Sequence, residues 1–556
     1  MQNFLKNKYV EIKLENNWYR YTNDTACCFF CGYLLEKNLE KSEAAKFLLN
    51  KYLDNEKTFE KNIKELIGNF SFIIIKNNSI ILAVDLYGSF PIYYSKSFEK
   101  IYIYSNPLSL KNKLNLNSIN FSSSFFAARA GFVLSDDTLL NNIKFVEAGK
   151  YLIIENNVVN KKTYFQYYPE IDKIYKNDQP ENFRISELSS LCLKIFSDLI
   201  QNANNRQIVI FLSGGHDSRL IACGLKKLGY TNVLCVSYGI KNNWEAYIGK
   251  KVSDKLNYKW KFVEVKLKDV LNFYQSEVFK NYIKLTNSLI SVHVISELFV
   301  LNKIRSSIDK NAIIINGQTG DFISGAHIPM DFSKDLQTDD IEIRKGRFLD
   351  AFIKKHCSLW DSLNKNKEDL SNLKNKIWTN LNSEIKISSN QKYDYQLYEY
   401  YEWKTRQSTY LVRNQKVYEF LQFDWRLPLW DQRLVKFFLY SSFKEKINQN
   451  LYKNFLYKEN WCNVWNKYPK KWYVQGKVST LRLIIKYSVG VLIGRKFWKI
   501  LDKKIFHWWH DNSFAIAIIS YNTWLFDKRG PRNAMSYLTE KWLKSHQIDW
   551  RGNKNE

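Results

Sequence analysis

The feature that most constrains this chain is an apolar run that ends in two adjacent glycines. Residues 207–212 read Gln-Ile-Val-Ile-Phe-Leu, as a buried strand does, and residues 213–218 read Ser-Gly-Gly-His-Asp-Ser. Residues 219–225 read Arg-Leu-Ile-Ala-Cys-Gly-Leu, and we expect a helix to start there. Glycines let the backbone turn sharply and approach a ligand, and the free N–H groups at a helix start attract an anion. We therefore expect an α/β unit whose turn holds phosphate groups.

A second apolar strand ends in a similar way. Residues 313–321 read Ile-Ile-Ile-Asn-Gly-Gln-Thr-Gly-Asp. Because a carboxylate alone would repel phosphate, Asp217 in the first turn implies a cation, and Mg²⁺ suits carboxylate and phosphate oxygens. If both strands belong to one parallel sheet, Asp217 and Asp321 lie at its ligand-binding edge and share one Mg²⁺.

Composition excludes several classes of protein. The chain has 556 residues, of which 45% are hydrophobic, so it is neither disordered nor collagen-like. At about 150 residues per domain this length suggests roughly three to four domains. Its formal charge of +28 favours anionic partners, namely nucleotides, nucleic acid or an acidic membrane.

Targeting signals and cysteine usage indicate a cytoplasmic protein. The first residues show no basic-then-apolar signal pattern, and no run of 18 apolar residues occurs. The eight cysteines are scattered, as in a reduced compartment. Cys27, Cys28 and Cys31 lie close together, but no second Cys/His pair completes a zinc pattern, so we interpret them as buried residues.

The pattern of runs and turns predicts four parts. The first is rich in strands, with a hairpin at 70–75 and 80–84, and a short helix is expected at Ser42–Tyr52. Alternating strands and helices after residue 207 favour a parallel sheet, and the chain is mainly helical from about Lys345. The expected boundaries are 1–165, a polar linker at 166–184, 185–460 and a C-terminal extension at 461–556.

These motifs carry a family resemblance. The first turn resembles the pyrophosphate loop of PP-loop ATP pyrophosphatases, and residues 313–321 resemble the second Gly/Asp motif of class B asparagine synthetases. Residues 424–431 resemble that family's Glu-x-Arg-x-Pro-Phe-Leu-Asp segment, with Asp424 in place of Glu. Residues 450–456 resemble the stretch that bears the family's catalytic lysine, and Lys453 is the matching position.

The resemblance implies ATP and Mg²⁺ as cofactors and assigns roles to residues. Lys453, Asp424 and Arg426 take the catalytic positions, although a salt-bridged acid explains Asp424 as well, and a solvated helix face would explain an isolated Lys453. His216 is expected to shape the pocket and His327 to be a hydrogen-bonded structural histidine. The metal ligands are Asp217 and Asp321. The nucleotide site comprises Ser213, Gly214, Gly215, Asp217, Ser218, Ser237, Gly317 and Gly320.

The first part resembles the family's glutaminase domain, an Ntn-hydrolase-like α+β sandwich. The matching residues are 66–70 and 85–94, with Thr138 and Gly149 near the end. Family glutaminases use a cysteine exposed as the first residue, but here residue 2 is Gln2 and the Asn-Gly-Glu segment is not evident. Only Asp85 matches the acid that holds the glutamine amine. We expect no glutamine hydrolysis, as in β-lactam synthetases and lasso-peptide cyclases.

The expected activity is an ATP-dependent amide ligase that adenylates a carboxylate and releases pyrophosphate. The carboxylate is aspartate, a sugar uronic acid, or that of a peptide or small molecule. The nitrogen comes from ammonia, an amine of the substrate or a separate glutaminase. Two alternatives stay open: a PP-loop enzyme that modifies tRNA, which the charge supports, and a non-catalytic scaffold with a vestigial ATP site. The leading interpretation expects no nucleic-acid partner.

Residues 470–510 are basic and aromatic, with apolar positions between the charges. One interpretation is a helical cap with a solvated basic face, which the charge pattern favours. The other is a surface that contacts the inner face of the membrane or an anionic polymer. The residues concerned are Lys470, Lys471, Trp472, Tyr473, Arg482, Leu483, Ile484, Lys486, Tyr487, Val491, Leu492, Arg495, Lys496, Phe497, Trp498, Lys503, Lys504, Trp508 and Trp509.

Overall fold

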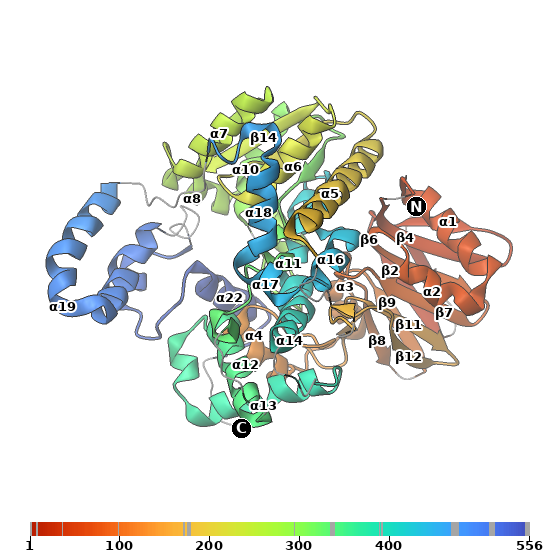
Figure 1. The fold of residues 1–556 in the computed structure, drawn as a ribbon. Coiled ribbons are helices and arrows are strands. Elements are labelled where there is room, and N and C mark those ends of the chain that lie inside the picture. The colour runs from red at the N-terminus through yellow and green to blue at the C-terminus, as the bar shows by residue number, and fades with distance from the viewer. Residues whose placement is uncertain are drawn as a thin grey trace.

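The computed structural model has an N-terminal two-sheet domain, a parallel-sheet domain and a largely helical C-terminal part (Figure 1). This architecture confirms the predicted α/β class. The structure describes residues 3–550, except 7–8, 36, 98, 171–172, 175–178, 294, 334–337, 339, 388–389, 391–392, 469–476 and 511–517.

Two largely antiparallel sheets form the N-terminal domain, and their inward side chains share one core. The hairpin expected at 70–75 and 80–84 is confirmed as β6 and β7, and the helix expected at Ser42–Tyr52 is α1. Helix α1 buries Ala44, Leu48 and Leu49. In spatial order, the first sheet is β1 (Asn3–Lys6), β2 (Val10–Leu14), β9 (Lys100–Tyr104), β8 (Tyr93–Ser97) and β10 (Lys144–Phe145). The second is β12 (Val158–Thr163), β11 (Lys150–Glu155), β7 (Ser79–Val84), β6 (Gly68–Lys76), β4 (Ala26–Leu34) and β3 (Tyr19–Thr22), and β5 (Leu39–Glu40) pairs with β4.

The second domain contains a five-stranded sheet in which every strand is parallel to its neighbours. All four residues of its central strand β13 are buried, so both faces of that strand are covered, as its apolar sequence predicts. The carboxyl ends of β13 and of its neighbour β16 therefore meet at one edge of the sheet. The strand order is β15 (Lys259–Glu264), β14 (Val233–Gly239), β13 (Ile208–Phe211), β16 (Ile313–Ile315) and β17 (Asp424–Arg426).

Helices surround this sheet and build the remainder of the chain (Figure 1). Helix α5 (Glu181–Ala203) precedes the sheet in the chain, and it buries Leu188, Ile195 and Leu199 at helical spacing. The α-helices are α1 (Lys41–Asp54), α2 (Phe59–Lys64), α3 (Pro107–Leu114), α4 (Phe121–Ala130), α5 (Glu181–Ala203), α6 (His216–Lys227), α7 (Trp244–Leu256), α8 (Leu267–Gln275), α9 (Glu277–Thr286), α10 (Ser296–Ile304), α11 (Gly320–Ile323), α12 (Ile341–His356), α13 (Lys367–Asn382), α14 (Asp394–Glu402), α15 (Lys416–Phe420), α16 (Gln432–Leu439), α17 (Phe443–Lys446), α18 (Asn450–Glu459), α19 (Lys477–His510), α21 (Tyr521–Phe526) and α22 (Ala534–Ser545). A π-helix, η7 (Trp403–Tyr410), and a 3₁₀-helix, η8 (Leu411–Gln415), follow α14.

The first two domains are joined through a continuous buried core. The Arg426 guanidinium donates a hydrogen bond of 2.9 Å to Glu40 and lies 4.0 Å from the centre of the Tyr33 ring. Phe90 stacks on Trp425 with ring centres 5.2 Å apart. The N-terminal domain therefore stabilises strand β17 of the parallel sheet directly.

Helix α19 is a hairpin rather than a straight rod, because Gly494 has non-helical angles in its middle. The two arms are tied by Arg482, which donates hydrogen bonds of 2.5 and 2.7 Å to Asp502, and by Trp498, which packs on Gly490. The hairpin projects away from both other domains (Figure 1). None of the described helices combines the length and apolar character that a membrane crossing requires.

Five of the predicted apolar residues of the first arm do not pack on the body of the protein. Leu483, Ile484, Tyr487, Val491 and Leu492 are all exposed. The segment 470–473, which belongs to the same predicted patch, lies outside the described residues, as do the side chains of residues 495, 496 and 509.

Candidate active site

The first Gly-rich turn lies between β13 and α6, as the sequence predicts. The Ser213 backbone N–H donates to the Ser218 hydroxyl over 3.2 Å, and the Gly215 N–H donates to the Ser213 hydroxyl over 3.1 Å. Beneath the turn, the buried Arg219 guanidinium donates to the Gly214 carbonyl over 2.5 Å. These bonds hold the turn in place at the N-terminus of α6, where backbone N–H groups favour an anion.

The second Gly-rich turn follows β16 and is held by side chains from η8 and α15. Asn316 donates to Gln415 and to the Tyr418 hydroxyl, each over 3.0 Å. Gln415 in turn donates to the Gln318 side chain over 2.7 Å. The turn is thus fixed by residues almost a hundred positions later in the chain.

The two turns are in direct contact. The Asp321 backbone N–H donates to Asp217 Oδ2 over 3.2 Å. A Cβ at Gly317 would lie 2.9 Å from the Asp217 Cβ, and a Cβ at Gly320 would lie 2.8 Å from the Asp217 Cγ. Because real Cβ contacts are longer, only glycine lets the second turn approach Asp217 this closely. The structure therefore brings Asp217 and Asp321 together at one edge of the sheet.

Helix α18 supplies the third side of the site. The Tyr452 hydroxyl donates to Asp217 Oδ1 over 2.8 Å. The preceding turn is anchored by Gln449, whose amide donates to the Ser324 hydroxyl over 2.8 Å. Lys453 follows Tyr452, is half-buried, and forms no hydrogen bond or ion pair with any residue that the structure describes. Sequence reasoning missed Tyr452, because a tyrosine in an apolar helix pattern is indistinguishable from a core residue.

His327 connects Asp321 to a buried glutamate. Its Nε2 lies 3.2 Å from Asp321 Oδ2, and its Nδ1 lies 2.5 Å from Glu402 Oε1. Although burial opposes a charged ring, the two carboxylates raise the pKa of His327 to about 9. Burial would raise the pKa of Asp321, but His327 outweighs it and lowers that pKa to about 2. His327 therefore keeps Asp321 ionised. Its two hydrogen bonds match the structural, hydrogen-bonded histidine that we expected at this position.

Glu402 is the centre of a charged cluster that sequence reasoning missed. Its side chain is fully buried where α14 meets the π-helix η7. Lys355 Nζ lies 3.2 Å from it, His356 Nε2 lies 3.2 Å from it, and Arg406 Nη1 lies 3.7 Å from it. Because π-helices are rare and often occur at functional sites, this irregularity marks the region next to Asp321 as more than packing.

Three other predicted site residues lie away from the turns. Ser237, near the end of β14, is buried and donates to the Leu212 carbonyl over 2.7 Å, so it supports the first turn from below. Asp424 is aligned with Ile313 at the amino end of the sheet and forms a 2.6 Å ion pair with Arg206. Arg426 points into the domain interface described above. The structure does not bring Asp424 or Arg426 to Asp217, and the salt-bridge interpretation of Asp424 describes its position.

The donor set fits Mg²⁺ together with a polyphosphate. Asp217 and Asp321 present two carboxylates beside backbone N–H groups, and Mg²⁺ is commonly held by one or two carboxylates plus phosphate oxygens. Among the described residues no group of three or more His, Cys, Asp or Glu could hold a metal ion by itself. Phosphate oxygens and water would therefore complete the coordination.

Asp85 in the N-terminal domain is fully engaged by the backbone. Its Oδ2 accepts from the Phe70 N–H over 2.8 Å, and its Oδ1 accepts from the N–H groups of Tyr87 and Ser89 over 2.7 and 3.2 Å. Burial raises its pKa. This carboxylate therefore holds the turn at residues 85–89 together.

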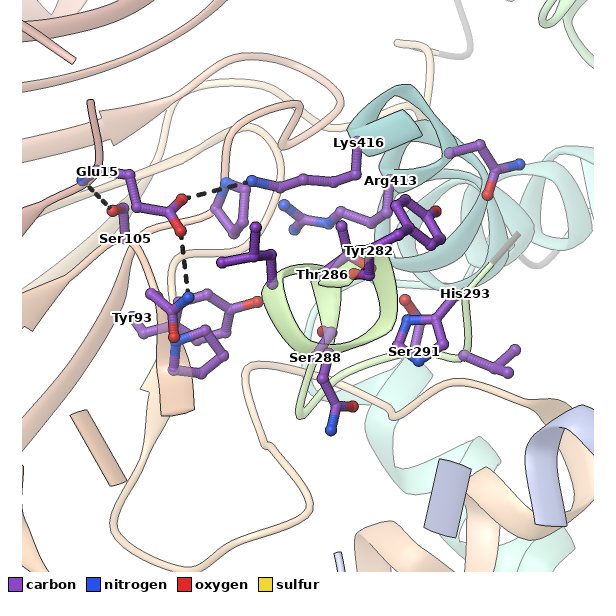
Figure 2. A pocket seen from close by; sticks show the side chains of 17 residues that line it. Glu15, Tyr93, Ser105, Tyr282, Thr286, Ser288, Ser291, His293, Arg413 and Lys416 are labelled. Atoms are coloured by element: carbon purple, nitrogen blue, oxygen red, sulfur yellow. Dashed lines mark hydrogen bonds and ion pairs between the residues drawn. The ribbon is translucent and has the colours of Figure 1, made fainter. Parts of the chain in front are cut away.

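A separate pocket lies between the first two domains (Figure 2). It contains about 540 Å³ of empty space, part of it open to solvent. Glu15 and Tyr93 line it from the N-terminal domain, and Arg413 and Lys416 line it from the opposite side. None of its lining residues belongs to the two Gly-rich turns.

Comparison with known proteins agrees with the geometry of the turns. A family model described as asparagine synthase matches residues 200–458. Residues 200–458 thus resemble an asparagine synthase domain. The matched range includes Asp217, Asp321 and Lys453. A search among curated proteins finds no match.

Two solved structures are similar over part of their length. One is an allosteric regulatory enzyme of purine biosynthesis, at 12% identity and a TM-score of 0.19, covering 54% of this chain and 62% of that chain. The other is a glutamine phosphoribosylpyrophosphate amidotransferase from B. subtilis, at 11% identity and a TM-score of 0.19, covering 55% and 64%. This chain thus spans less than two thirds of either structure's length.

Proposed function

We propose that this protein is an ATP-dependent amide ligase. A substrate carboxylate attacks the α-phosphorus of ATP, which yields an acyl-adenylate and pyrophosphate. An amine or ammonia then attacks the acyl carbon, which yields the amide, AMP and a proton. The observation that carries the proposal is the contact between Asp217 and Asp321 at the carboxyl edge of the parallel sheet. The asparagine synthase match over residues 200–458 supports it.

The residues of the chain supply distinct parts of this reaction. Backbone N–H groups of the first turn, with the hydroxyls of Ser213 and Ser218, bind the departing phosphates. A bound Mg²⁺ would neutralise phosphate charge, and Asp217 and Asp321 would hold it. Tyr452 orients Asp217 through its hydrogen bond. Lys453, which has no partner among the described residues, stabilises negative charge on the reacting acyl or phosphate group.

The nitrogen source in this proposal is ammonia or an amine, rather than glutamine bound by the N-terminal domain. The backbone bonds to Asp85 support this, because they occupy the acid that would bind the glutamine amine. The carboxylate is aspartate, a sugar uronic acid, or that of a peptide or small molecule.

The test is pyrophosphate release from ATP and Mg²⁺ in the presence of each candidate carboxylate, with and without ammonium. Asp217→Asn should abolish Mg²⁺-dependent release. Lys453→Ala should retain ATP binding and reduce amide formation by about 10²–10³-fold, because it removes one charge-stabilising donor. Lys458→Ala is the matched control, since Lys458 lies on the same helix and pairs with Glu181 at 3.3 Å.

Three results would contradict the proposal. If no carboxylate elicits pyrophosphate release, the chain is better described as a scaffold. Release that requires RNA, with salt-sensitive RNA binding, would favour a tRNA-modifying enzyme. Full amide formation by Lys453→Ala would remove the lysine from the mechanism.

A further inference from the structure

The projecting hairpin α19 exposes an unusual amount of apolar surface. Large apolar side chains are exposed all along it, and Leu492, beside the bend at Gly494, is 86% exposed. Soluble proteins rarely leave a contiguous apolar patch of this kind uncovered. The exposed large apolar residues of the hairpin are Leu481, Leu483, Ile484, Tyr487, Val489, Val491, Leu492, Phe497 and Ile500.

These side chains are distributed around the first arm of the hairpin rather than along one stripe. Leu483 and Leu481 differ by two positions, and so do Val489 and Val491, which places them on different sides of a helix. A helix that is apolar all round belongs in a protein core or in contact with lipid. The contacts between the arms cover only part of this surface, because Trp498 and Gly490 are the buried positions near the bend.

The charge of the hairpin is strongly positive. Between residues 477 and 510 the only acid is Asp502, which Arg482 already neutralises. The basic residues are Lys477, Arg482, Lys486, Arg495, Lys496, Lys499, Lys503 and Lys504. Exposed apolar side chains among basic ones are complementary to an anionic bilayer, in which acyl chains lie beneath negative headgroups.

The base of the hairpin is fixed, whereas the bend is free of the protein body. Trp508 donates from its indole N–H to the Ile519 carbonyl over 3.0 Å, and Trp524 donates to the Lys504 carbonyl over 3.1 Å. Trp508 and Trp524 belong to a small core with Trp360. The rigid attachment at the base leaves the bend as the part that meets a partner (Figure 1).

We propose that the bend of α19 inserts into the surface of an anionic membrane, with Val491, Leu492 and Phe497 among the acyl chains. Each arm is about 25 Å long at 1.5 Å per residue, which is shorter than the roughly 30 Å hydrocarbon core. The arms are therefore too short to span the bilayer. This inference is independent of the proposed reaction.

Flotation of the full chain with vesicles tests the inference. Wild-type protein should float with phosphatidylcholine vesicles that contain about 30% phosphatidylglycerol, and should float much less with phosphatidylcholine alone. Leu492→Asp should weaken vesicle binding by about tenfold or more, because it places a charge on the side chain that inserts among the acyl chains. Phe121→Asp is the matched control, since Phe121 on α4 is 79% exposed but lies in the N-terminal domain, and it should bind like wild type.

Several outcomes would overturn the inference. Absence of flotation with anionic vesicles would do so, and so would wild-type flotation by Leu492→Asp. If light scattering instead shows a wild-type dimer that Leu492→Asp dissociates, the hairpin binds a second copy of this chain. Binding to RNA that equals binding to vesicles would assign the surface to anionic polymers.

A second inference rests on Arg413 in the pocket between the domains. Its side chain extends into the middle of the pocket (Figure 2). The guanidinium forms no hydrogen bond or ion pair with any described residue, and its Nε and Nη1 atoms are buried. A buried charge without a partner is costly, so such a group normally has a counter-ion or ordered water.

The ion pairs around the pocket show which of its cations lacks a counter-ion. Glu15, the acid among the lining residues, lies 3.7 Å from Lys416 Nζ, and Lys416 Nζ also lies 3.2 Å from Glu419. Arg413 is thus the cationic side chain of the pocket that forms no ion pair with a described residue. We infer that this pocket binds a small monocarboxylate, whose two oxygens match the paired N–H donors of the Arg413 guanidinium.

This second site is linked to the first. Arg413 lies two residues before Gln415, which holds Asn316 and Gln318 in the second Gly-rich turn. A ligand on Arg413 therefore contacts the segment that positions this turn.

Thermal unfolding of the full chain in sodium acetate, against sodium chloride of equal ionic strength, tests this inference. Acetate should raise the Tm of the wild type by about 2 °C or more once it saturates the site. Arg413→Met should lose this rise, and Arg305→Met, which removes an exposed arginine outside the pocket, should keep it. An equal rise with chloride, a rise with inorganic phosphate only, or a rise retained by Arg413→Met would each overturn the inference.

Discussion

Gly320→Ala is the substitution that most directly tests the contact between the two Gly-rich turns. The added Cβ would lie 2.8 Å from Asp217 Cγ and 2.9 Å from Leu429 Cδ1. Neither neighbour can yield easily, because Asp217 is held by Tyr452 and Leu429 is buried. Overpacking of this kind costs about 1–3 kcal/mol of stability and displaces the second turn.

The expected effect on the reaction is larger than the effect on stability. A displacement of about 1 Å between catalytic groups can reduce a rate by roughly a hundredfold. Gly320→Ala should therefore remain folded but release pyrophosphate about a hundred times more slowly. Rates would be measured with a coupled pyrophosphate assay, and stability by urea unfolding of the same preparation.

Gly346→Ala is the control for a glycine whose Cβ would meet nothing within 4 Å. It lies inside helix α12, where alanine is favoured over glycine by up to about 1 kcal/mol, so this variant should be slightly more stable and equally active. The reasoning fails if Gly320→Ala has wild-type stability and wild-type release, because the turns then do not need their close approach.

Three further variants or conditions give distinct outcomes. Tyr452→Phe, which removes the hydrogen bond to Asp217, should lower stability by about 1 kcal/mol and slow pyrophosphate release, and an unchanged rate would show that the hydroxyl does not orient the carboxylate. Asp424→Asn should lower the free energy of unfolding in urea by less than about 1 kcal/mol, because the Asp424 side chain in its pair with Arg206 is 41% exposed. Pyrophosphate release should be unchanged. Loss of that activity would instead support the catalytic role predicted for Asp424. Burial lowers the pKa of His356 to about 4 from its ordinary 6.5, so the unfolded chain takes up a proton first as the pH falls. The free energy of unfolding should thus drop by about 1.4 kcal/mol between pH 7.5 and 5.5 from this group, and His356→Gln should flatten that dependence.

The sheet and its first turn were predictable because their signals are local. The apolar run before Ser213 and the two glycines after it predict a strand, a turn and a helix without reference to the remainder of the chain. The meeting of Asp217 with Asp321 followed from one further assumption, that both strands run parallel in one sheet.

The position of Asp424 could not be predicted in the same way. A motif shows that a residue belongs to a strand, but the edge of the sheet on which it lies depends on the register. Here Asp424 pairs with Ile313, the first residue of β16, whereas the second Gly-rich turn follows Ile315, the last residue of that strand. The register places Asp424 at the opposite edge.

The Glu402 cluster could not be predicted because its members come from separate segments. His327, Lys355 and Arg406 reach Glu402 only after α12, α14 and η7 have packed together.

The exposure of the hairpin α19 could not be predicted for a different reason. Its basic residues were visible in the sequence, but a solvated cap and an exposed apolar surface have the same pattern until tertiary structure shows what covers it.

The stacking of Phe90 on Trp425 and the contact of Arg426 with Tyr33 have a consequence for how this protein can be divided or can evolve. Separating the chain near residue 170 would leave Phe90 and Tyr33 of one half, and Trp425 and Arg426 of the other, facing water, so neither half should stay soluble by itself. Deleting the first domain would remove one wall of the neighbouring sheet's interior, so the fold needs this domain whatever its own chemistry.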